Sequence, residues 1–367
     1  MKVLHIITGN DDGGGAKHLL NLCLNSEGKI ESAIGCIGMG SLYEKAKKNN
    51  IECILFSPMS FFGREAADSI IEKGFDIVNF HGAKAFFLRK LLGRKLDLPS
   101  VATVHSNYKQ DFLNSRIKHM LFTPMSISGL RSFDYFICVS NYIKNILNLD
   151  GMRGRKFVIP NGIDLDECRV SNDAESIRRS LGIGPDDFVF TMVARFHPVK
   201  NHATLIKAFT KLKAEFDNAK LVLIGDGKYR AEIEAAAGEG VIFAGYKENV
   251  LDYINASDIT VLTSLSEGGA PPLVILESAA ANKTVIASSV SDMPYIINGG
   301  NGFLVDPYSE EDIYLKLREA YLHPDAIKAM GENLNRYVKE KFSIDKFCRN
   351  YYDAYKTIIE ESKVVKI

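Results

Sequence analysis

The sequence predicts an α/β protein that contains two doubly wound parallel sheets. Short apolar runs alternate with amphipathic helical patterns along most of the 367 residues. A chain of this length is too long for one compact core and suits two domains. The alternation is interrupted after the motif PNGID, where the polar stretch LDECRVSNDAES is typical of a linker. We therefore expect one series of strands and helices on each side of this stretch.

The first series opens with a strand, a glycine-rich loop and a helical pattern, AKHLLNLCLN, which together begin an α/β unit. Its expected strands are Val3–Thr8, Ala33–Ile37, Cys53–Phe56, Asp76–Phe80, Val101–His105, Tyr135–Val139 and Phe157–Ile159. Charged helical stretches such as LYEKAKKNN lie between them. Strands that alternate with helices favour a parallel sheet that is covered on both faces. We assign residues 1–165 to this first domain.

The second series follows the linker and is assigned to residues 174–342. Its expected strands are Phe188–Ala194, Lys220–Gly225, Val241–Ala244, Ile259–Thr263, Thr284–Ala287 and Gly302–Val305. Ligands of doubly wound sheets bind beyond the carboxyl ends of the strands. This rule places the loop Asn10–Gly15, His81, His105, Arg195 and the segment Glu267–Glu277 at the rims of the two sheets.

The composition is that of a soluble globular protein, with 46% hydrophobic and 25% charged residues. The formal net charge of +0 hides a division between the two halves of the chain. Up to Asp164 there are 21 Lys and Arg against 15 Asp and Glu, a balance of +6, and the remainder carries −6. This asymmetry suits a first domain that meets an anionic partner or a membrane face, and it is equally consistent with compositional drift.

The six cysteines lie far apart, and no CxxC or Cys/His spacing offers a zinc site. They are typical of buried free thiols in a reducing compartment. The opening apolar run is too short for a signal peptide, and no stretch of about 18 apolar residues suggests a membrane span. We therefore expect a cytoplasmic protein.

Two short motifs suggest weaker sites. Gly13, Gly14 and Gly15 follow the first strand and precede a helix, so their backbone could approach a phosphate at the helix N-terminus. The contiguous glycines fit neither GxGxxG nor a P-loop, and a plain tight turn explains them equally well. Asp164-Leu165-Asp166 has the DxD spacing of metal-dependent transferases. A lone carboxylate pair is a poor metal site, so we expect no metal.

Arg195, Lys200 and Glu277 form the stronger pattern, because each follows an apolar strand or lies on the helix after one. Arginine can bind phosphate oxygens through two parallel hydrogen bonds, and lysine adds a compact charge. These cations would stabilise a departing nucleoside diphosphate, on which negative charge develops. A carboxylate can bridge the two hydroxyls of a ribose. The pattern therefore suggests a nucleotide-sugar site.

Over nearly its whole length the chain resembles the family-4 glycosyltransferases, which are retaining enzymes of the GT-B fold. The most specific matches are IPNGID, VARFHPVKN, IGDG and the segment Ser264–Pro307. The resemblance implies two Rossmann-like domains that face each other across a cleft, with the acceptor on the first and the nucleotide sugar on the second. It also implies that C-terminal helices, residues 343–367 among them, pack back toward the first domain.

The resemblance implies a role for individual residues. Arg195 and Lys200 would bind the donor diphosphate and Glu277 the ribose. His105, which closes a TVH-type strand, would lie near the donor sugar, so His105, Arg195 and Lys200 are the catalytic candidates. The remaining donor-binding candidates are Gly14 and Gly15 at the phosphates or the acceptor, Asn161, and the loop residues Glu267, Gly268 and Gly269.

Two segments depart from the family pattern. Glu267 lies ten positions before Glu277, whereas the family usually places an acid eight positions before, so the loop SEGGAPP is two residues longer. The family's later GGxPE is replaced by Ser291–Tyr295, which lacks the glycines and the acid. Structural readings also stay open for the histidines. His105 could be a strand-end residue with satisfied hydrogen bonds. For His81 a structural and a functional role are equally favoured, and His5 is expected in the core.

The implied reaction is transfer of a sugar from a nucleoside diphosphate, most commonly UDP, to an acceptor hydroxyl in surface polysaccharide or lipid-linked glycan synthesis. The nucleotide sugar is a substrate, and neither a cofactor nor a nucleic acid partner is expected. Two alternatives remain: a nucleotide-sugar epimerase, and a non-catalytic module that binds nucleotide. The basic stretches Lys84–Lys95 and Asn114–Arg131 could contact the inner face of a membrane peripherally, or could be ordinary surface helices.

Overall fold

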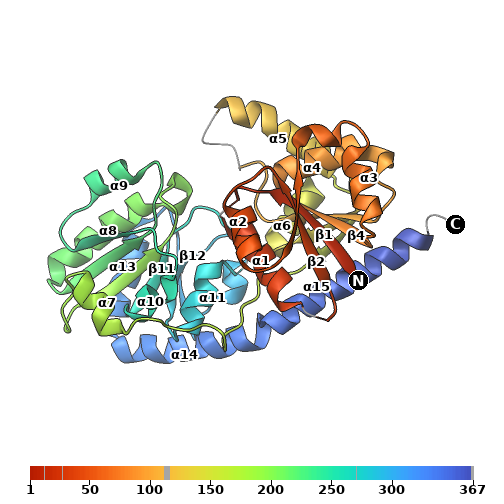
Figure 1. Cartoon of the computed structure of the whole chain (residues 1–367). Coiled ribbons are helices and arrows are strands. Elements are labelled where there is room, and N and C mark those ends of the chain that lie inside the picture. The colour runs from red at the N-terminus through yellow and green to blue at the C-terminus, as the bar shows by residue number, and fades with distance from the viewer. Residues whose placement is uncertain (12, 27, 111–115, 270, 365–367) are drawn as a thin grey trace. The chain divides into compact units, whose positions relative to one another are not determined.

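The computed structural model describes residues 1–11, 13–26, 28–110, 116–269 and 271–364 (Figure 1). The chain forms two compact units. Unit 1 comprises Met1–Gly162 together with Ile344–Ile367, and unit 2 comprises Ile163–Ser343. Each unit contains one parallel sheet with helices packed on it, as expected from the alternation in the sequence.

Unit 1 contains a seven-stranded sheet in the order β3-β2-β1-β4-β5-β6-β7. Its strands are β1 (Lys2–Thr8), β2 (Glu31–Ile37), β3 (Glu52–Phe56), β4 (Ile77–His81), β5 (Ser100–Val104), β6 (Tyr135–Cys138) and β7 (Arg155–Val158). Its helices are α1 (Gly14–Asn25), α2 (Ser41–Lys48), η1 (Pro58–Phe61), α3 (Glu65–Glu72), α4 (Gly82–Leu92), η2 (Gly93–Lys95), α5 (Arg116–Leu130), α6 (Asn141–Leu149) and α15 (Ile344–Val364).

Unit 2 contains a six-stranded sheet in the order β10-β9-β8-β11-β12-β13. Its strands are β8 (Phe188–Val193), β9 (Ala219–Ile224), β10 (Val241–Gly245), β11 (Ile259–Leu262), β12 (Val285–Ser288) and β13 (Gly302–Val305). Its helices are α7 (Ala174–Ser180), η3 (Pro198–Lys200), α8 (His202–Glu215), α9 (Arg230–Ala236), α10 (Val250–Asn255), α11 (Leu273–Ala280), α12 (Met293–Ile296), α13 (Glu310–Leu322) and α14 (Pro324–Lys341).

The prediction of two doubly wound domains is confirmed, and every expected strand is present within two residues of its predicted bounds. The central strands are buried on both faces, as the continuous apolar runs required. In each sheet the strand order reverses direction beside the first strand. The reversal lies between β1 and β4 in unit 1 and between β8 and β11 in unit 2. These are the points at which doubly wound sheets bind ligands.

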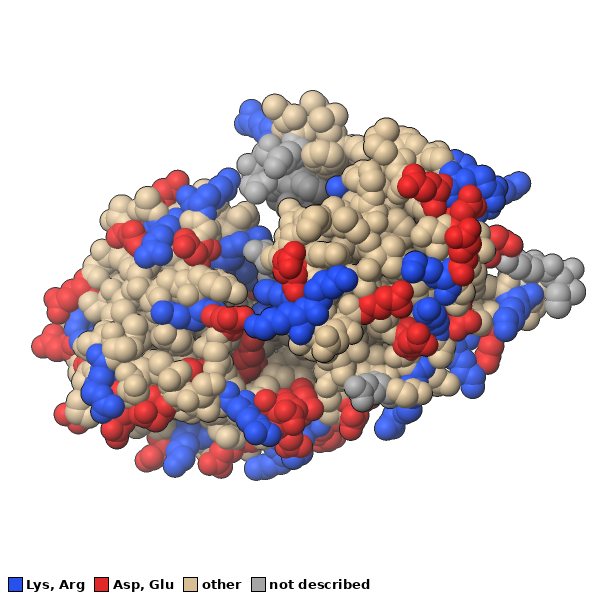
Figure 2. Space-filling view, in the orientation of Figure 1, with Lys and Arg blue, Asp and Glu red and all other residues tan. Residues whose placement is uncertain are grey.

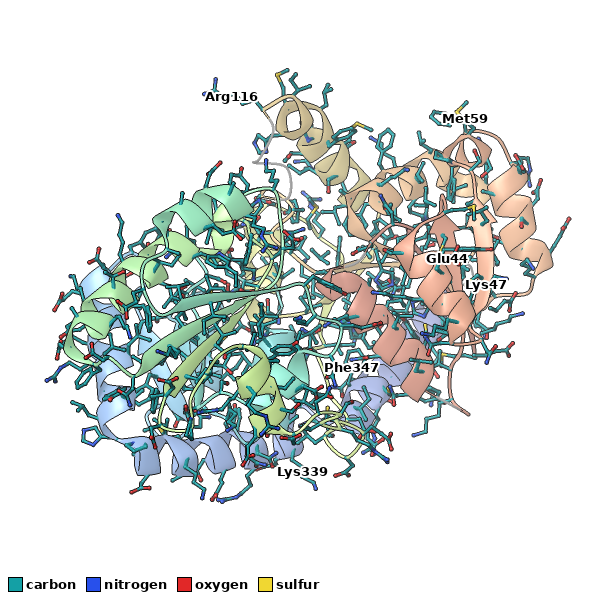
Figure 3. The ribbon with its side chains drawn as sticks, turned by 60° about the vertical axis from the view of Figure 1, so that its left-hand side comes forward. Glu44, Lys47, Met59, Arg116, Lys339 and Phe347 are labelled. Atoms are coloured by element: carbon teal, nitrogen blue, oxygen red, sulfur yellow. The ribbon has the colours of Figure 1, made fainter. Side chains whose placement is uncertain are left out.

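Helix α15 covers one face of the unit 1 sheet, so C-terminal residues do pack on the first sheet. Its buried side chains, among them Phe347 and Tyr351, join a core cluster with the sheet residues Val3, Ile77 and Val101. Phe347, labelled in Figure 3, also meets the ring of His18 on α1 edge to face, with ring centroids 4.8 Å apart. The last helix of the chain is therefore part of the core of unit 1.

Charged side chains of both signs are interspersed on the face that Figure 2 displays. Within the described ranges, no helix combines the length and the apolarity needed to cross a bilayer.

Candidate functional site

Arg195 and Lys200 lie in the loop that follows β8, at the carboxyl edge of the unit 2 sheet. Arg195 follows the last residue of β8 by two positions and is exposed, and Lys200 ends the short helix η3. The loop after β11, the strand beside β8, contains Glu267. Both loops leave the carboxyl edge at the reversal of strand order, so the fold places these side chains at one rim.

Lys200 and Glu267 form an ion pair across this rim. The Nζ of Lys200 lies 2.5 Å from Oε1 of Glu267, and the two side chains are only 22% and 11% exposed. Backbone bonds fix the two loops beside each other, because the Leu265 amide donates to the carbonyl of Val199. An ammonium group has three donors, so Lys200 can hold Glu267 and still bind a phosphate oxygen. The structure thus gives Glu267 a defined partner, which the spacing in the sequence left open.

The IGDG motif brings a third loop against the Arg195 loop. A Cβ on Gly225, whose φ is +144°, would lie 2.1 Å from the carbonyl oxygen of Ala194, and one on Gly227 would lie 2.4 Å from that of Phe196. Only glycine permits this approach. The Phe196 amide then donates to the Asp226 carbonyl at 2.9 Å. The loops after β8 and β9 are therefore held together beside Arg195.

Cations concentrate around His197 in this region. Burial lowers the pKa of His197, and the neighbouring charges of Arg195, Lys228 and Lys200 lower it further. The Nδ1 of His197 accepts from the Val199 amide, so the ring helps to shape the loop that carries Lys200. Lys228 and His197 are additions to the residues that the sequence singled out. Lys228 directly follows the IGDG motif, and this position was the signal in the sequence that could have identified it. This concentration of positive charge can bind an anion such as a diphosphate.

Glu277 lies on α11, which follows the loop that contains Glu267, Gly268 and Gly269. The helix begins after Pro272, and no side chain of the described residues caps it, so the N–H groups of Leu273 and Val274 in its first turn are suited to an anion. Glu277 is partly exposed in the middle of this helix, close enough to Cys168 to help raise the pKa of its thiol to about 11, mainly through burial. Of the loop SEGGAPP, Ala270 lies outside the described residues.

The glycine-rich loop of unit 1 forms the N-terminus of α1. Gly13 caps the helix without a side-chain hydrogen bond, and its amide donates to Oδ1 of Asp11 at 2.8 Å. A Cβ on Gly14 would meet open space. A Cβ on Gly15 would touch the ring of His105 at 3.4 Å. The structure therefore brings Gly15 against His105, and Gly14 precedes Gly15 in the first turn of α1.

His105 belongs to a cluster of histidines on α1, β1, β4 and the end of β5. Its Nε2 lies 2.9 Å from Nδ1 of His81, whose Nε2 lies 3.2 Å from Nδ1 of His5. His18 meets the ring of His105 edge to face with centroids 4.8 Å apart. Burial is the main reason why the pKa of His5 falls to about 3, that of His18 to about 4, and those of His81 and His105 well below the usual value. All four rings are neutral near pH 7.

Asn161 is directed into this cluster. It is 8% exposed, and its Oδ1 lies 2.7 Å from Nδ1 of His18. The other nitrogen of His18 lies 2.7 Å from the hydroxyl of Tyr351 on α15. The side chain of Asn161 therefore orients a buried histidine. His5 is a core residue as expected, and His81 is buried as well.

The motifs that departed from the family pattern, or suggested a metal, have structural roles. Ser291 has a φ of +53°, the left-handed region that glycine would occupy without strain, and its hydroxyl donates to the Glu267 carbonyl at 2.5 Å. Oδ1 of Asp164 accepts from the amides of Asp166 and Glu167. Asp166 forms an ion pair with Lys339, whose Nζ lies 3.8 Å from its Oδ1. The hydrogen bond from Ser291 therefore joins the segment that replaces GGxPE to the lengthened SEGGAPP loop at Glu267.

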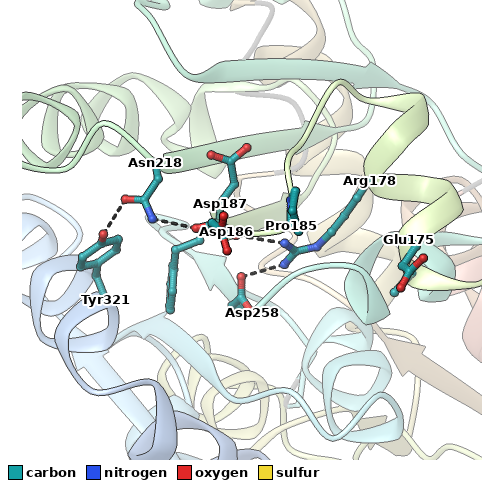
Figure 4. A pocket seen from close by; sticks show the side chains of 10 residues that line it. Glu175, Arg178, Pro185, Asp186, Asp187, Asn218, Asp258 and Tyr321 are labelled. Carbon is teal, nitrogen blue, oxygen red and sulfur yellow. Dashed lines mark hydrogen bonds and ion pairs between the residues drawn. The ribbon is translucent and has the colours of Figure 1, made fainter.

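A separate pocket of about 510 Å³ opens at the opposite edge of the unit 2 sheet, beside Phe188 at the start of β8 (Figure 4). Arg178 in its wall pairs with Asp258 at 3.0 Å and donates to the carbonyls of Ala256 and Asp187. The hydroxyl of Tyr321 donates to Asn218. These groups are engaged in the fold, and the pocket lies away from the residues above.

Two family models match the chain in succession. The model described as Glycosyltransferase Family 4 matches residues 42–167, and the one described as Glycosyl transferases group 1 matches residues 173–337. The boundary between the two matches falls close to the start of unit 2 at Ile163.

Curated relatives and solved structures agree with these matches. The UDP-Gal:alpha-D-GlcNAc-diphosphoundecaprenol alpha-1,3-galactosyltransferase of Escherichia coli is 26% identical over 77% of this chain and 75% of its own. The alpha-monoglucosyldiacylglycerol synthase of Streptococcus pneumoniae is 29% identical over 78% and 67%. Anabaena HepE, solved in complex with UDP and glucose, superposes with a TM-score of 0.83 at 17% identity over 97% of this chain and 100% of its own. Sucrose-phosphate synthase of Thermosynechococcus elongatus gives 0.78 at 17% over 98% and 100%. With the two-sheet architecture, these findings show that the chain belongs to the family-4 glycosyltransferases of the GT-B fold.

Proposed function

We propose that the protein is a retaining glycosyltransferase that moves a sugar from a UDP-sugar to an acceptor hydroxyl in the synthesis of a surface polysaccharide or a lipid-linked glycan. The observation that carries the donor assignment is the concentration of cations at the carboxyl edge of unit 2, where Lys200 is held by Glu267 beside Arg195. Departure of a nucleoside diphosphate places negative charge at such a rim, and fixed cations stabilise that charge.

UDP is proposed as the nucleotide because relatives and structural neighbours act on or bind it. The Escherichia coli relative takes UDP-Gal, and HepE was solved with UDP. We assign the ribose to Glu277, and the diphosphate to Arg195 and Lys200 with the open N-terminus of α11. In unit 1, Gly14, Gly15 and His105 would serve the sugar or the acceptor, because they line the N-terminus of α1.

Transfer is proposed to proceed without a metal ion, since Arg195, Lys200 and Lys228 can supply the charge that a metal would otherwise bring to the diphosphate. A chelator such as EDTA should therefore leave the transfer rate unchanged. A rate that falls with EDTA and returns with Mg²⁺ or Mn²⁺ would contradict this part of the proposal.

A peripheral membrane contact is proposed through unit 1, and α5 is its most suitable element. Ile117 and Met120 are 69% and 70% exposed, and Leu121 and Phe122 are exposed beside them. Arg116, which is exposed and is labelled in Figure 3, begins this helix. In Figure 2 the surface around the helix is mostly without charged side chains. An apolar surface next to a cation suits anionic lipid. Co-sedimentation should increase with the anionic fraction of the vesicles and fall in the double variant Ile117→Ser, Met120→Ser.

The donor is identified by a thermal-shift screen of nucleoside diphosphate sugars, followed by transfer assays with lipid-linked and soluble glycan acceptors. A ligand that binds the folded state raises its melting temperature, so UDP and one UDP-sugar should shift it while other nucleotides should not. NMR of the product should show the anomeric configuration of the donor. An inverted product would overturn the retaining assignment.

The same assays separate the two alternatives. An epimerase would convert the UDP-sugar to an isomer in the absence of any acceptor. A non-catalytic module would be stabilised by UDP but would yield no glycan product with any acceptor. Acceptor-dependent release of UDP supports transfer alone.

A further inference from the structure

A row of polar side chains crosses the buried face of the unit 1 sheet and ends at His105. In the parallel register, His5 lies opposite Asn79 on the neighbouring strand, and His81 lies opposite Thr103 on the next. Because side chains two residues apart share a face of a strand, His5, His81 and His105 project to the same side. This is the side that α15 covers. The three imidazoles are thus brought into line by the order β1-β4-β5.

The tautomers of the three rings are coupled. His81 uses both of its nitrogens, Nδ1 toward Nε2 of His105 and Nε2 toward Nδ1 of His5. A neutral imidazole has one N–H donor and one bare nitrogen acceptor. Each N···N contact needs one hydrogen. Because His81 has only one N–H, it donates in one contact and accepts in the other, so both hydrogen bonds run in the same direction along the row. The third hydrogen then lies at one end, either on Nε2 of His5 or on Nδ1 of His105.

The two ends of the row have different surroundings. The Nε2 of His5 is fully buried, and no other described residue gives it a hydrogen-bond partner. Its ring packs against the Tyr355 ring at 6.2 Å, and the hydroxyl of Tyr355 is engaged by the Asn79 amide. Nδ1 of His105 likewise has no partner among the described residues, but His105 is partly exposed and this atom is not among the buried ones.

A buried N–H without an acceptor is rarer and more costly than an unsatisfied acceptor. The third hydrogen is therefore more stable on the accessible Nδ1 of His105, where water or a ligand can accept it. The neighbouring titratable groups do not reverse this preference. His18 on α1 is itself neutral and bonded to Asn161 and Tyr351, and Tyr351 and Tyr355 on α15 are buried phenols.

We propose that His5 and His81 are positioning residues that hold His105 in the tautomer with hydrogen on Nδ1, so that His105 presents a hydrogen-bond donor to a hydroxyl of a substrate bound at the glycine-rich loop of unit 1. This inference rests on the proposed function and sharpens the role of His105. The bare Nε2 that a general base would need is turned inward toward His81. His105 thus stabilises developing negative charge or orients a hydroxyl, and it removes no proton.

The tautomer can be measured directly on the full chain. In protein labelled with ¹⁵N-histidine, nitrogen shifts distinguish a protonated from a bare ring nitrogen, and single His→Gln variants assign the signals. We expect hydrogen on Nδ1 of His105 and on Nδ1 of His5. Hydrogen on Nε2 of His105 would overturn the proposal. This readout does not require activity, so it stands even if no donor is turned over.

The kinetic test compares His5→Leu with His5→Gln. Leucine removes the donor that fixes His81, so the row can reverse, and we expect kcat to fall about five- to tenfold, equivalent to one buried hydrogen bond, with KM nearly unchanged. The Gln amide can donate to Nε2 of His81, so His5→Gln should restore kcat to within about threefold of the parent. The proposal fails if both variants keep the parental kcat, or if His5→Gln is as slow as His5→Leu.

A control separates this effect from loss of packing. Val3→Ala alters the same strand and the same face as His5 but removes no hydrogen bond. It should lower stability while kcat stays parental below its melting temperature. UDP binding, which we assign to unit 2, should be the same in all of these variants. A wild-type chain that binds no UDP and transfers no sugar would count against the proposed function. The tautomer measurement would still test the role given to His5 and His81, because it does not depend on activity.

Discussion

Lys200 is the single side chain on which donor binding should depend most. Its ammonium is held at 2.5 Å by Glu267 and lies beside Arg195, so it needs little reorganisation to meet a phosphate. We expect Lys200→Ala to lower kcat/KM about 100-fold or more with a UDP-sugar. The matched control is Lys207→Ala, because Lys207 is an exposed lysine on α8. Equal rates in the two variants would remove Lys200 from the donor site.

Glu267 gives an opposite prediction for nucleotide affinity. Its carboxylate neutralises part of the charge on Lys200, and the pair is mostly shielded from solvent. Glu267→Gln keeps the shape and removes that neutralisation, so UDP should bind about three- to tenfold more tightly. Calorimetric titration of both proteins with UDP measures the change. Weaker binding in Glu267→Gln would mean that the carboxylate holds Lys200 in its working position more than it competes with the phosphate.

At the scale of elements, the sequence was sufficient for the strands and for the sheet edge at which Arg195, Glu267 and His105 lie. The runs of Val, Ile, Leu and Phe are those of strands buried on both faces, and parallel order then places Arg195 and Glu267 at one carboxyl edge. It was not sufficient for contacts that depend on which strands are neighbours and in what register. The line from His5 to His105, the Asn161–His18 bond and the Lys200–Glu267 pair each join residues 24 or more positions apart. Local patterns contain no information on such distances.

Helix α15 should stabilise unit 1 through a polar contact as well as through its apolar face. The hydroxyl of Tyr351 lies 2.7 Å from Nε2 of His18, which already donates through Nδ1 to Asn161 and therefore needs a donor at Nε2. Tyr351→Phe leaves that nitrogen buried and unpaired, so the free energy of unfolding of unit 1 should fall by about 1–3 kcal/mol. Tyr352→Phe is the control, since no hydrogen bond of its hydroxyl is found within the described residues. Urea unfolding followed by circular dichroism compares them, and equal midpoints would contradict the role given to Tyr351.

For the molecule as a whole, the neutral histidines predict that acid destabilises unit 1 more than unit 2. Burial lowers the pKa of His5 to about 3 and that of His18 to about 4, and it lowers those of His81 and His105 as well, whereas an unfolded histidine titrates near 6.5. Below pH 6.5 the unfolded chain therefore binds protons that the folded unit does not. The stability that the neutral histidines contribute is therefore fully present above about pH 6.5 and is lost as the pH falls below it.

Unit 2 has fewer such groups. The pKa of His202 falls to about 4 through burial, and that of His197 is also lowered. Each deeply buried neutral histidine should cost about 2 kcal/mol of stability between pH 7 and pH 5. Hydrogen exchange at these two pH values, corrected for the intrinsic pH dependence of exchange, should show peptides of β1 and β4 losing more protection than those of β8 and β11. In His18→Phe one titrating group is absent, so the loss in unit 1 between the two pH values should shrink. An equal loss of protection in both units would show that the buried histidines of unit 1 do not govern its response to acid.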